Sequence, residues 1–291
     1  PFNPLFLAVL VFGWSKIKKY TGYNIIDLFE MSSNKNERSE NPCRGGRMPV
    51  SDDPWKIEVY KTAKNELPQS VGMEIGVLPK FPSMQLLVGK SGSGKSNLLV
   101  DFLKKESLMA GFFDEVYFVS PTAATDDLVE LLSLAPDHVW DDIPQAVLDL
   151  TVLMDNQAYD IETKGILKSK KVLVVFDDCV GNKAIMKSEI LTKIAIHGRH
   201  SLMSSIICTQ SYTKVPRVIR LQAQGLALFP SSQNEVKLLC DDYCPPHTSK
   251  KEFIKIIEFA TDEPFSFMYI QNHCQNVKDR FRKRLGEIID F

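Results

Sequence analysis

The residues with the clearest chemistry lie in one short stretch, "GKSGSGKSN", which begins at Gly89. Its spacing G-x-x-x-x-G-K-S fits the phosphate-binding loop, in which glycines let successive backbone N–H groups turn toward one anion. Lys95 would neutralise the β- and γ-phosphates, and the Ser96 hydroxyl would coordinate Mg²⁺. A helix that begins near Lys95 would direct its positive dipole end at the β-phosphate. The predicted nucleotide-binding residues are Gly89, Lys90, Ser91, Gly92, Ser93, Gly94, Lys95 and Ser96.

The flanking residues separate this loop from a flexible linker, since glycine–serine linkers can show the same spacing. The apolar stretch "MQLLV" precedes the loop, and "NLLVDFL" follows it. A strand before and a helix after are the context that a phosphate-binding loop requires. The sequence therefore predicts a site for a Mg²⁺-bound nucleoside triphosphate.

Two adjacent acids, Asp177 and Asp178, end the apolar stretch "KVLVVFDD". A buried parallel strand that ends here would deliver both carboxylates to the sheet edge that carries the phosphate loop. Asp177 could then hold Mg²⁺ through water or Ser96, and Asp178 would orient and deprotonate an attacking water. Many such enzymes have Glu at the second position. The alternative is that the pair only caps the following turn.

A polar pair, Thr209 and Gln210, ends a second buried stretch, "SSIICTQ". We expect this strand to lie between the loop strand and the Asp177 strand. The Gln210 amide could then bond the γ-phosphate or the attacking water and report hydrolysis to the rest of the molecule. By itself, a glutamine at a strand end is more often a solvated turn residue.

Composition sets the limits of the fold and its partners. The 291 residues are 44% hydrophobic and 24% charged, which suits one large α/β core with or without a small appendage. The formal net charge of −1 excludes a global attraction to nucleic acid or membrane, so DNA contact requires a local basic patch. Cys179 and Cys208 lie in apolar stretches, which favours a reducing, intracellular compartment. Cys240 and Cys244 lack the usual Cys-x-x-Cys spacing, so metal binding near the C-terminus is left open.

Three parts are predicted along the chain. Residues 1–53 would form an N-terminal extension and disordered linker; the first 30 lie outside the fold, and their apolar run is shorter than the roughly 20 residues that span a bilayer. Residues 54–232 would form the P-loop core. Residues 233–291 would form a helical extension that completes the core or docks on it.

The fold class predicted for the core is α/β, with a mostly parallel central sheet flanked by helices. Near-continuous apolar strand candidates alternate with helical patterns at residues 115–120, 171–178, 204–210, 225–229 and 265–270. "WKIEVY" (55–60) and "MEIGVL" (73–78) are predicted as short antiparallel strands. Residues 277–289 show helical periodicity, which predicts an amphipathic helix with a wet basic face or, less favoured, a helix that grips DNA phosphates.

At this point the sequence resembles a known family. "LLVGKSGSGKSNLL", "VLVVFDDC", "HGRHSLMSSIICTQ" and "VPRVIRLQAQGLALFP" are similar, in the same order, to segments of the FtsK/HerA superfamily of P-loop DNA translocases. Within it they are most similar to the poxvirus-type DNA-packaging ATPases of large eukaryotic DNA viruses, virophages and Maverick/Polinton elements. The resemblance covers roughly residues 80–232. It implies a RecA-like core that works as a homo-oligomeric ring and drives double-stranded DNA into a capsid with ATP and Mg²⁺.

The resemblance also assigns roles to residues. It implies that Lys95 and Ser96 form the Walker A pair, that Asp177 and Asp178 form the Walker B pair, and that Gln210 is the polar sensor. The family's arginine–histidine segment matches Arg199 and His200. The expected catalytic residues are Lys95, Asp178, Gln210 and Arg199, and the expected Mg²⁺ ligands are Ser96 and Asp177.

Phosphoryl transfer in this class is completed by a cation from the neighbouring subunit. Arg199, Arg217 and Arg220 are the candidate arginine fingers, Arg199 first by family position, and all three are expected on the loop edge of the sheet.

The remaining expectations concern partners and alternatives. The resemblance implies action in a cytoplasmic virus factory or the nucleus, or association with the virion, with capsid proteins as partners and no membrane contact. A helicase-like DNA-processing ATPase on the same core stays open. A GTPase is disfavoured because no Asn-Lys-x-Asp element follows, and a small-molecule kinase would need an Arg-rich lid. A nucleotide-gated scaffold that does not hydrolyse ATP would keep the loop without the second acid.

Overall fold

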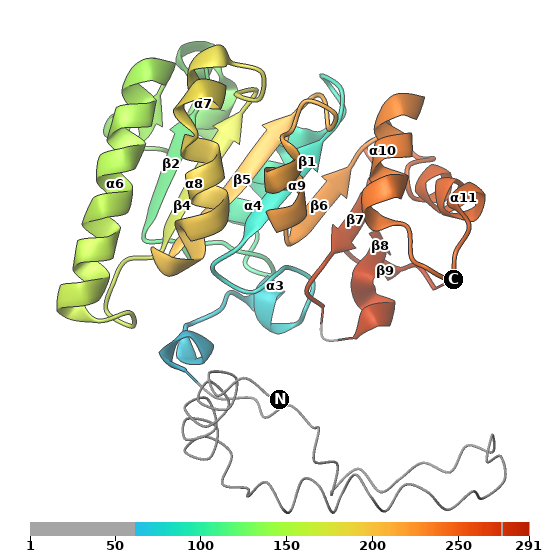
Figure 1. Ribbon diagram of the computed structural model, residues 1–291, viewed down its shortest axis with the longest axis horizontal. Coiled ribbons are helices and arrows are strands. Elements are labelled where there is room, and N and C mark those ends of the chain that lie inside the picture. Colours follow the sequence, from blue (N-terminus) through green and yellow to red (C-terminus); the bar gives the residue numbers. More distant parts are fainter. Residues whose placement is uncertain (1–61, 275, 291) are drawn as a thin grey trace, which may run out of the picture. The chain divides into compact units, whose positions relative to one another are not determined.

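The computed structural model describes residues 62–274 and 276–290. These residues form an α/β fold in which a central sheet is flanked by helices (Figure 1). The strands of the described residues are β1 (Met84–Val88), β2 (Glu115–Val119), β3 (Val139–Trp140), β4 (Val172–Asp177), β5 (Met203–Thr209), β6 (Gly225–Leu228), β7 (Met268–Gln271), β8 (Phe281–Lys283) and β9 (Glu287–Ile288). Their α-helices are α3 (Val71–Glu74), α4 (Lys95–Lys104), α5 (Asp127–Leu131), α6 (Ile143–Lys164), α7 (Lys183–Ser188), α8 (Ile190–His197), α9 (Arg217–Gln222), α10 (Gln233–Tyr243) and α11 (Lys250–Ala260).

All nine described strands belong to one sheet, in the order β3-β2-β4-β5-β1-β6-β7-β8-β9. The pairs from β3 to β6 are parallel, whereas β6–β7, β7–β8 and β8–β9 are antiparallel. The predicted fold class is therefore confirmed. The strand that ends in Thr209 lies between the loop strand β1 and the acid strand β4, as the sequence predicted.

Both faces of the sheet are buried, which explains why its central strands are mostly apolar and why their few polar residues, such as Gln85 in β1 and Ser204 in β5, are also buried. Successive residues of β1 point to opposite faces: Leu86 and Val88 belong to one core, and Leu87 belongs to the other. The first core also contains apolar residues of α6, α8, α9, α10 and α11. The second contains apolar residues of α3, α4 and α5.

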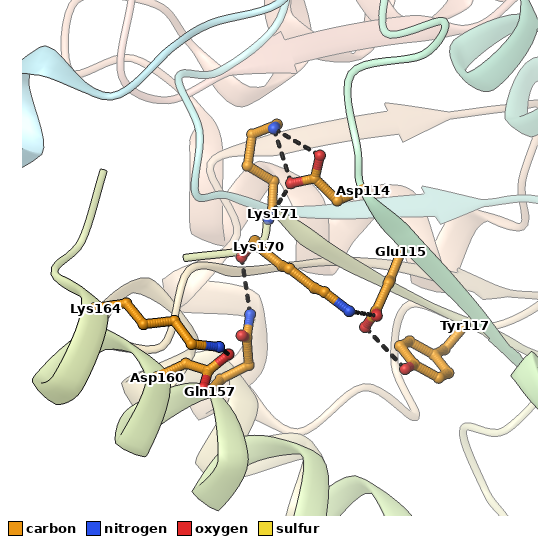
Figure 2. A network of polar contacts seen from close by, with 8 residues as sticks. All are labelled: Asp114, Glu115, Tyr117, Gln157, Asp160, Lys164, Lys170 and Lys171. Carbon is orange, nitrogen blue, oxygen red and sulfur yellow. Dashed lines mark hydrogen bonds and ion pairs between the residues drawn. The ribbon is translucent and has the colours of Figure 1, made fainter. Parts of the chain in front are cut away.

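The edge of the sheet where β2 and β4 begin is fixed by a polar network (Figure 2). Lys171 donates to Asp114 from its backbone N–H at 2.7 Å and from its Nζ at 2.8 and 3.0 Å. Lys170 pairs with Glu115, and the Gln157 amide on α6 donates to the Lys170 carbonyl at 2.9 Å. Exposed ion pairs contribute little free energy by themselves, about 0–1 kcal/mol each. Together, these contacts fix the C-terminal half of α6 to the start of β4, and the start of β4 to the start of β2.

Two short strands are predicted before the phosphate loop, and the structure describes the residues of one of them. The expected strand at residues 73–78 is wrong, because this segment contains the end of α3 and a turn. The N–H groups of Met73 and Glu74 both bond the Ser70 carbonyl, which closes a helical turn instead of a ladder. Residues 55–60 and the predicted extension 1–53 lie outside the described residues.

The amphipathic helix predicted at residues 277–289 is also wrong. The segment forms a 3-10 turn, η5 (Val277–Arg280), followed by β8 and β9. Phe281 pairs with Ile270 of β7 and packs edge-on against the Phe253 ring at 5.4 Å. Lys283 is buried and pairs with two carboxylates instead of forming a wet basic face. The edge of β7 offered this segment a ladder, and that tertiary pairing outweighed a helical periodicity.

Within the described residues, the α-helices of the C-terminal part are α10 and α11. The strands β7, β8 and β9 extend the core sheet well past residue 232, the boundary predicted from the sequence. Among the described helices, none is both long enough and apolar enough to cross a membrane.

Candidate nucleotide-binding site

The glycine-rich loop connects β1 to α4, and its glycines are required by its geometry. Gly92 and Gly94 have positive φ values of 74° and 106°, which favour glycine. A Cβ at Gly89 would lie 2.6 Å from the Phe229 Cβ and 2.6 Å from the Ser93 Oγ, so a side chain there would collide with the core. The loop backbone thus follows the tight path predicted from the spacing.

Lys95, Ser96 and Ser93 have distinct surroundings in the loop. Lys95 is only 9% exposed, and its Nζ donates to the Gly89 carbonyl at 2.8 Å and to the Lys90 carbonyl at 3.0 Å. Ser96 is exposed in the first turn of α4. The Ser93 Oγ is buried without a protein hydrogen-bond partner. A buried hydroxyl needs a partner, and a phosphate oxygen bound in the loop would supply one.

The two acids lie where β4 ends, level with the phosphate loop. Asp177 pairs with Cys208 in the register of β4 and β5, and the Gly89 N–H bonds the Thr209 carbonyl at 3.1 Å. Burial raises the pKa of Asp177 from 3.8 to about 6, with further contributions from the negative charges of Asp178 and Asp126. Lys95 opposes this rise. Asp177 is therefore a half-buried carboxylate beside the loop lysine, in a place that favours binding of a cation.

The predicted sensor contacts the second acid directly. The Gln210 Nε2 donates to the Asp178 Oδ2 at 2.7 Å. The Asp178 backbone bends to φ 47°, and its N–H bonds the Cys208 carbonyl at 3.1 Å. The structure thus brings together the loop, both acids and Gln210 at one edge of the sheet, on the strands β1, β4 and β5.

Asp126 is a third acid at this edge that the sequence reasoning missed. It caps α5 by accepting a hydrogen bond from the Leu128 N–H at 3.0 Å. It lines an open cleft of about 490 Å³ together with Ser96 and Asn97. The signal was available, because Asp126 and Asp127 follow β2, the strand next to β4, shortly after its carboxyl end.

The loop after Gln210 is bound to α10, which sequence reasoning also missed. The buried Glu235 accepts hydrogen bonds from the Ser211 Oγ at 2.9 Å, the Thr213 N–H at 2.8 Å and the Thr213 Oγ1 at 3.1 Å. One carboxylate thereby satisfies three donors of the loop. This bracing fixes the segment that follows the sensor.

Among the candidate arginine fingers, Arg199 does not lie at the loop edge, which corrects the expectation for that residue. Arg199 lies in η4 (Gly198–His200), before β5, whereas Gln210 follows the end of β5. The seven residues of β5 separate the two positions by roughly 20 Å, at about 3.3 Å per residue. Arg220 is buried in an ion pair with Asp242, and its guanidinium stacks over Tyr212 at 5.0 Å. Arg217 is exposed at the start of α9.

The sequence matches the family described as Poxvirus A32 protein over residues 77–273. The chain belongs to this family. The match includes the phosphate loop, both acids and Gln210, and it confirms the resemblance to the poxvirus-type branch. Within the described residues, no group of three or more Cys, His, Asp or Glu side chains forms a further metal site.

This member of the Poxvirus A32 protein family is also similar to individual proteins. The chain is 23% identical to uncharacterized protein 075L of Invertebrate iridescent virus 6 over 194 residues, 66% of this chain and 71% of that protein. It is similar to the genome packaging NTPase B204 of Sulfolobus turreted icosahedral virus 2, with a TM-score of 0.43, 15% identity and coverage of 65% of this chain and 92% of that chain. It is also similar to EssC (ATPases 2 and 3) of Geobacillus thermodenitrificans, with a TM-score of 0.46, 14% identity and coverage of 66% and 38%.

Proposed function

We propose that this chain is an ATP-driven translocase that packages a double-stranded DNA genome, viral or virus-like, into a capsid. The observation that carries the proposal is the hydrogen bond of Gln210 to Asp178, beside a phosphate loop, in a member of the Poxvirus A32 protein family. A nucleotide-gated scaffold has no use for this pair. A water-activating acid coupled to a polar sensor suits an enzyme that hydrolyses the nucleotide and responds to hydrolysis.

The residues present fit Mg²⁺-bound ATP. Oxygen ligands of the kind that Mg²⁺ prefers would come from Ser96 and Asp177, and the ion would neutralise charge on the β- and γ-phosphates. The loop N–H groups and Lys95 would hold the phosphates, and Lys95 would exchange its bonds to the loop carbonyls for bonds to phosphate oxygens. The Asp178 carboxylate would accept a proton from the attacking water, and Gln210 would hold that carboxylate in position.

The proposal also assigns a place for the DNA. At the sheet edge opposite the nucleotide site, a cleft of about 470 Å³ is lined by basic and imidazole side chains and by no carboxylate. The residues that carry them are Lys64, Lys80, Arg199, His200 and His273. With a formal net charge of −1 overall, the chain needs such a local patch to attract a phosphate backbone. We therefore assign Lys64, Lys80, His200 and His273 of this cleft to DNA contact in the proposed motor, whereas Arg199 is assigned to the finger role described below.

The decisive assay is ATP turnover by the purified protein with and without double-stranded DNA, with GTP compared under the same conditions. We expect ATP turnover that DNA stimulates and that Lys95→Ala abolishes without loss of the fold, since the Lys95 Nζ serves the ligand. Lys80→Ala should keep basal turnover, weaken DNA stimulation and reduce its salt dependence. Unchanged turnover in Lys95→Ala would refute the nucleotide site, and turnover indifferent to DNA would refute the translocase.

We propose that the protein works as a homo-oligomeric ring, in which Arg199 is the finger that completes the site of a neighbouring subunit. At roughly 20 Å from its own Gln210 edge, Arg199 can complete a site only in a neighbouring subunit. Arg199→Ala should then bind ATP normally and hydrolyse it slowly, and mixing it with Lys95→Ala subunits should restore part of the turnover. Mixed particles that stay inactive would move the finger to Arg217, because Arg220 is already paired with Asp242.

Free cysteines support a reducing compartment as the place of action. The described cysteines Cys179, Cys208, Cys240, Cys244 and Cys274 form no disulfide. We propose that the protein acts inside the host cell, in a cytoplasmic virus factory or the nucleus, or with the virion, where capsid proteins would be its partners.

A further inference from the structure

An exposed aromatic ring stands directly beside the phosphate loop. Phe265 is 65% exposed, although it lies close to the N-terminus of α4. A Cβ placed on Gly94 would lie 3.4 Å from the Phe265 Cδ1 and 3.6 Å from its Cβ. The ring therefore borders the loop at the residue that precedes Lys95. The hydrolysis mechanism proposed above gives this large apolar side chain no role.

The backbone of Phe265 is strained, and the neighbouring residues keep it in that conformation. Phe265 has a φ of 60°, a left-handed conformation that is a genuine outlier for a bulky residue. Its neighbours are firmly fixed: the Phe267 ring packs against Phe229 at 5.0 Å, and the Ser266 Oγ donates to the Ala260 carbonyl at 2.9 Å. Such strain persists only where surrounding structure imposes it, and it is concentrated at functional sites.

Ion pairs fix the other side of the same segment. The buried Lys283 Nζ on β8 donates to Asp262 at 2.8 Å and to Glu263 at 2.9 Å. The Ser266 N–H bonds the Glu263 carbonyl at 3.1 Å and closes the turn that presents Phe265. The terminal β-hairpin that sequence reasoning missed is thus what holds the turn against the loop.

The side of the loop on which the ring lies indicates what it would contact. The γ-phosphate end of a nucleotide faces Asp177 and Asp178, and these acids lie toward β4 and β5 from the loop strand β1. Phe265 leads into β7, on the opposite side of β1, next to β6. A nucleotide with its phosphates in the loop and its terminal phosphate at the acids would leave its ribose and base to extend toward the other side of β1, where β6 and β7 lie.

We propose that Phe265 is the stacking platform for the nucleobase, a specificity-determining residue for the nucleotide. This inference rests on the proposed function, because it requires the loop to bind a nucleoside triphosphate. A flat, exposed phenyl ring stacks on any nucleobase and offers no hydrogen bond that would distinguish adenine from guanine. The ring therefore separates nucleotides from inorganic polyphosphates, and selects weakly between purines.

The test compares two ligands that share the phosphates and differ in the base. Affinities for a non-hydrolysable, Mg²⁺-bound ATP analogue and for Mg²⁺-bound inorganic tripolyphosphate are measured by calorimetry on the full chain. Phe265→Ala should weaken binding of the analogue about tenfold, in line with the loss of one stacked base, and leave tripolyphosphate binding unchanged. Phe265→Trp should retain or improve binding of the analogue. The matched control is Tyr159→Ala on α6, an aromatic residue of equal exposure at 66%, which should change neither affinity.

Phe265→Gly distinguishes a binding role from a packing role. Glycine adopts the positive φ without strain, so this variant should raise the Tm by about 2–4 °C while it weakens binding of the analogue as much as alanine does. A fall in Tm would show that the ring stabilises the fold. Equal losses for both ligands, or analogue binding that does not change in Phe265→Ala, would overturn the inference.

The outcome also separates this inference from the proposed function. Analogue binding that is lost in Lys95→Ala but unaffected in Phe265→Ala overturns the base platform alone. A wild-type chain that binds neither ligand overturns both. If Phe265→Ala impairs assembly of the subunits but leaves the affinity for the analogue unchanged, the phenyl side chain belongs to a subunit interface. This result would likewise overturn the inference.

Discussion

Asp177 is predicted to destabilise the nucleotide-free protein in its ionised form. Burial, together with the charges of Asp178 and Asp126, raises its pKa from 3.8 to about 6. At about 1.36 kcal/mol for each pH unit, the difference corresponds to roughly 3 kcal/mol of lost folding free energy. Below pH 3.8 the folded and unfolded forms both carry the proton, and the group contributes nothing. The loss accumulates as the pH rises from about 4 to 6 and is then constant.

The perturbation is Asp177→Asn, which keeps the shape of the side chain and removes its charge. At pH 7.5 the nucleotide-free variant should be more stable than the wild type by up to about 3 kcal/mol, which corresponds to a Tm higher by roughly 6–12 °C for a fold of this size. The gain should vanish below pH 4. Thermal and urea unfolding from pH 4 to 8 measure it, and the exposed Glu74→Gln on α3 serves as the control for general charge effects.

The same variant should bind Mg²⁺-ATP poorly, because the charge that destabilises the empty site is the one that attracts the cation. Stability and function therefore oppose each other at one carboxylate. The reasoning would be refuted if the variant is no more stable than the wild type, or if its gain in stability is the same at pH 4 and pH 7.5. Either result would show that the half-buried, ionised Asp177 does not destabilise the nucleotide-free protein.

Two further predictions concern the partners of this acid. Asp178→Asn should still bind Mg²⁺-ATP but lose turnover by roughly 10²- to 10⁴-fold, as removal of a general base does; parallel binding and turnover assays check this, and equal loss of binding in Asp177→Asn and Asp178→Asn would show that the roles are not divided. Glu235→Ala leaves three donors of Ser211 and Thr213 without their acceptor, so it should lower stability by about 1–3 kcal/mol in urea unfolding and slow turnover more than it weakens ATP binding, because it loosens the segment after Gln210. Wild-type turnover in Glu235→Ala would show that the hydrogen bonds of Glu235 do not affect the function of Gln210.

The sequence by itself determined the elements whose cause is local. The phosphate loop could be predicted because glycines at Gly92 and Gly94 are needed for its backbone path, and the lysine and serine follow at a fixed spacing. The central strands could be predicted because a sheet buried on both faces favours apolar residues at most positions along a strand. Since β4 and β5 end at the loop edge, Asp177 and Gln210 were placed correctly from chain order alone.

Only the tertiary structure decided the features that depend on pairing between distant segments. Residues 277–289 have a helical period, but part of this segment forms the strands β8 and β9, and β8 pairs with β7. The hydrogen bonds between β7 and β8 and the burial of Phe281 outweigh the local helical preference. The place of Phe265 beside Gly94 joins residues 171 positions apart, and no local pattern records such a contact. A functional motif within one segment, such as the phosphate loop, can be recognised in the sequence. Contacts between distant segments, such as that of Phe265 with Gly94, are known only from the fold that brings those segments together.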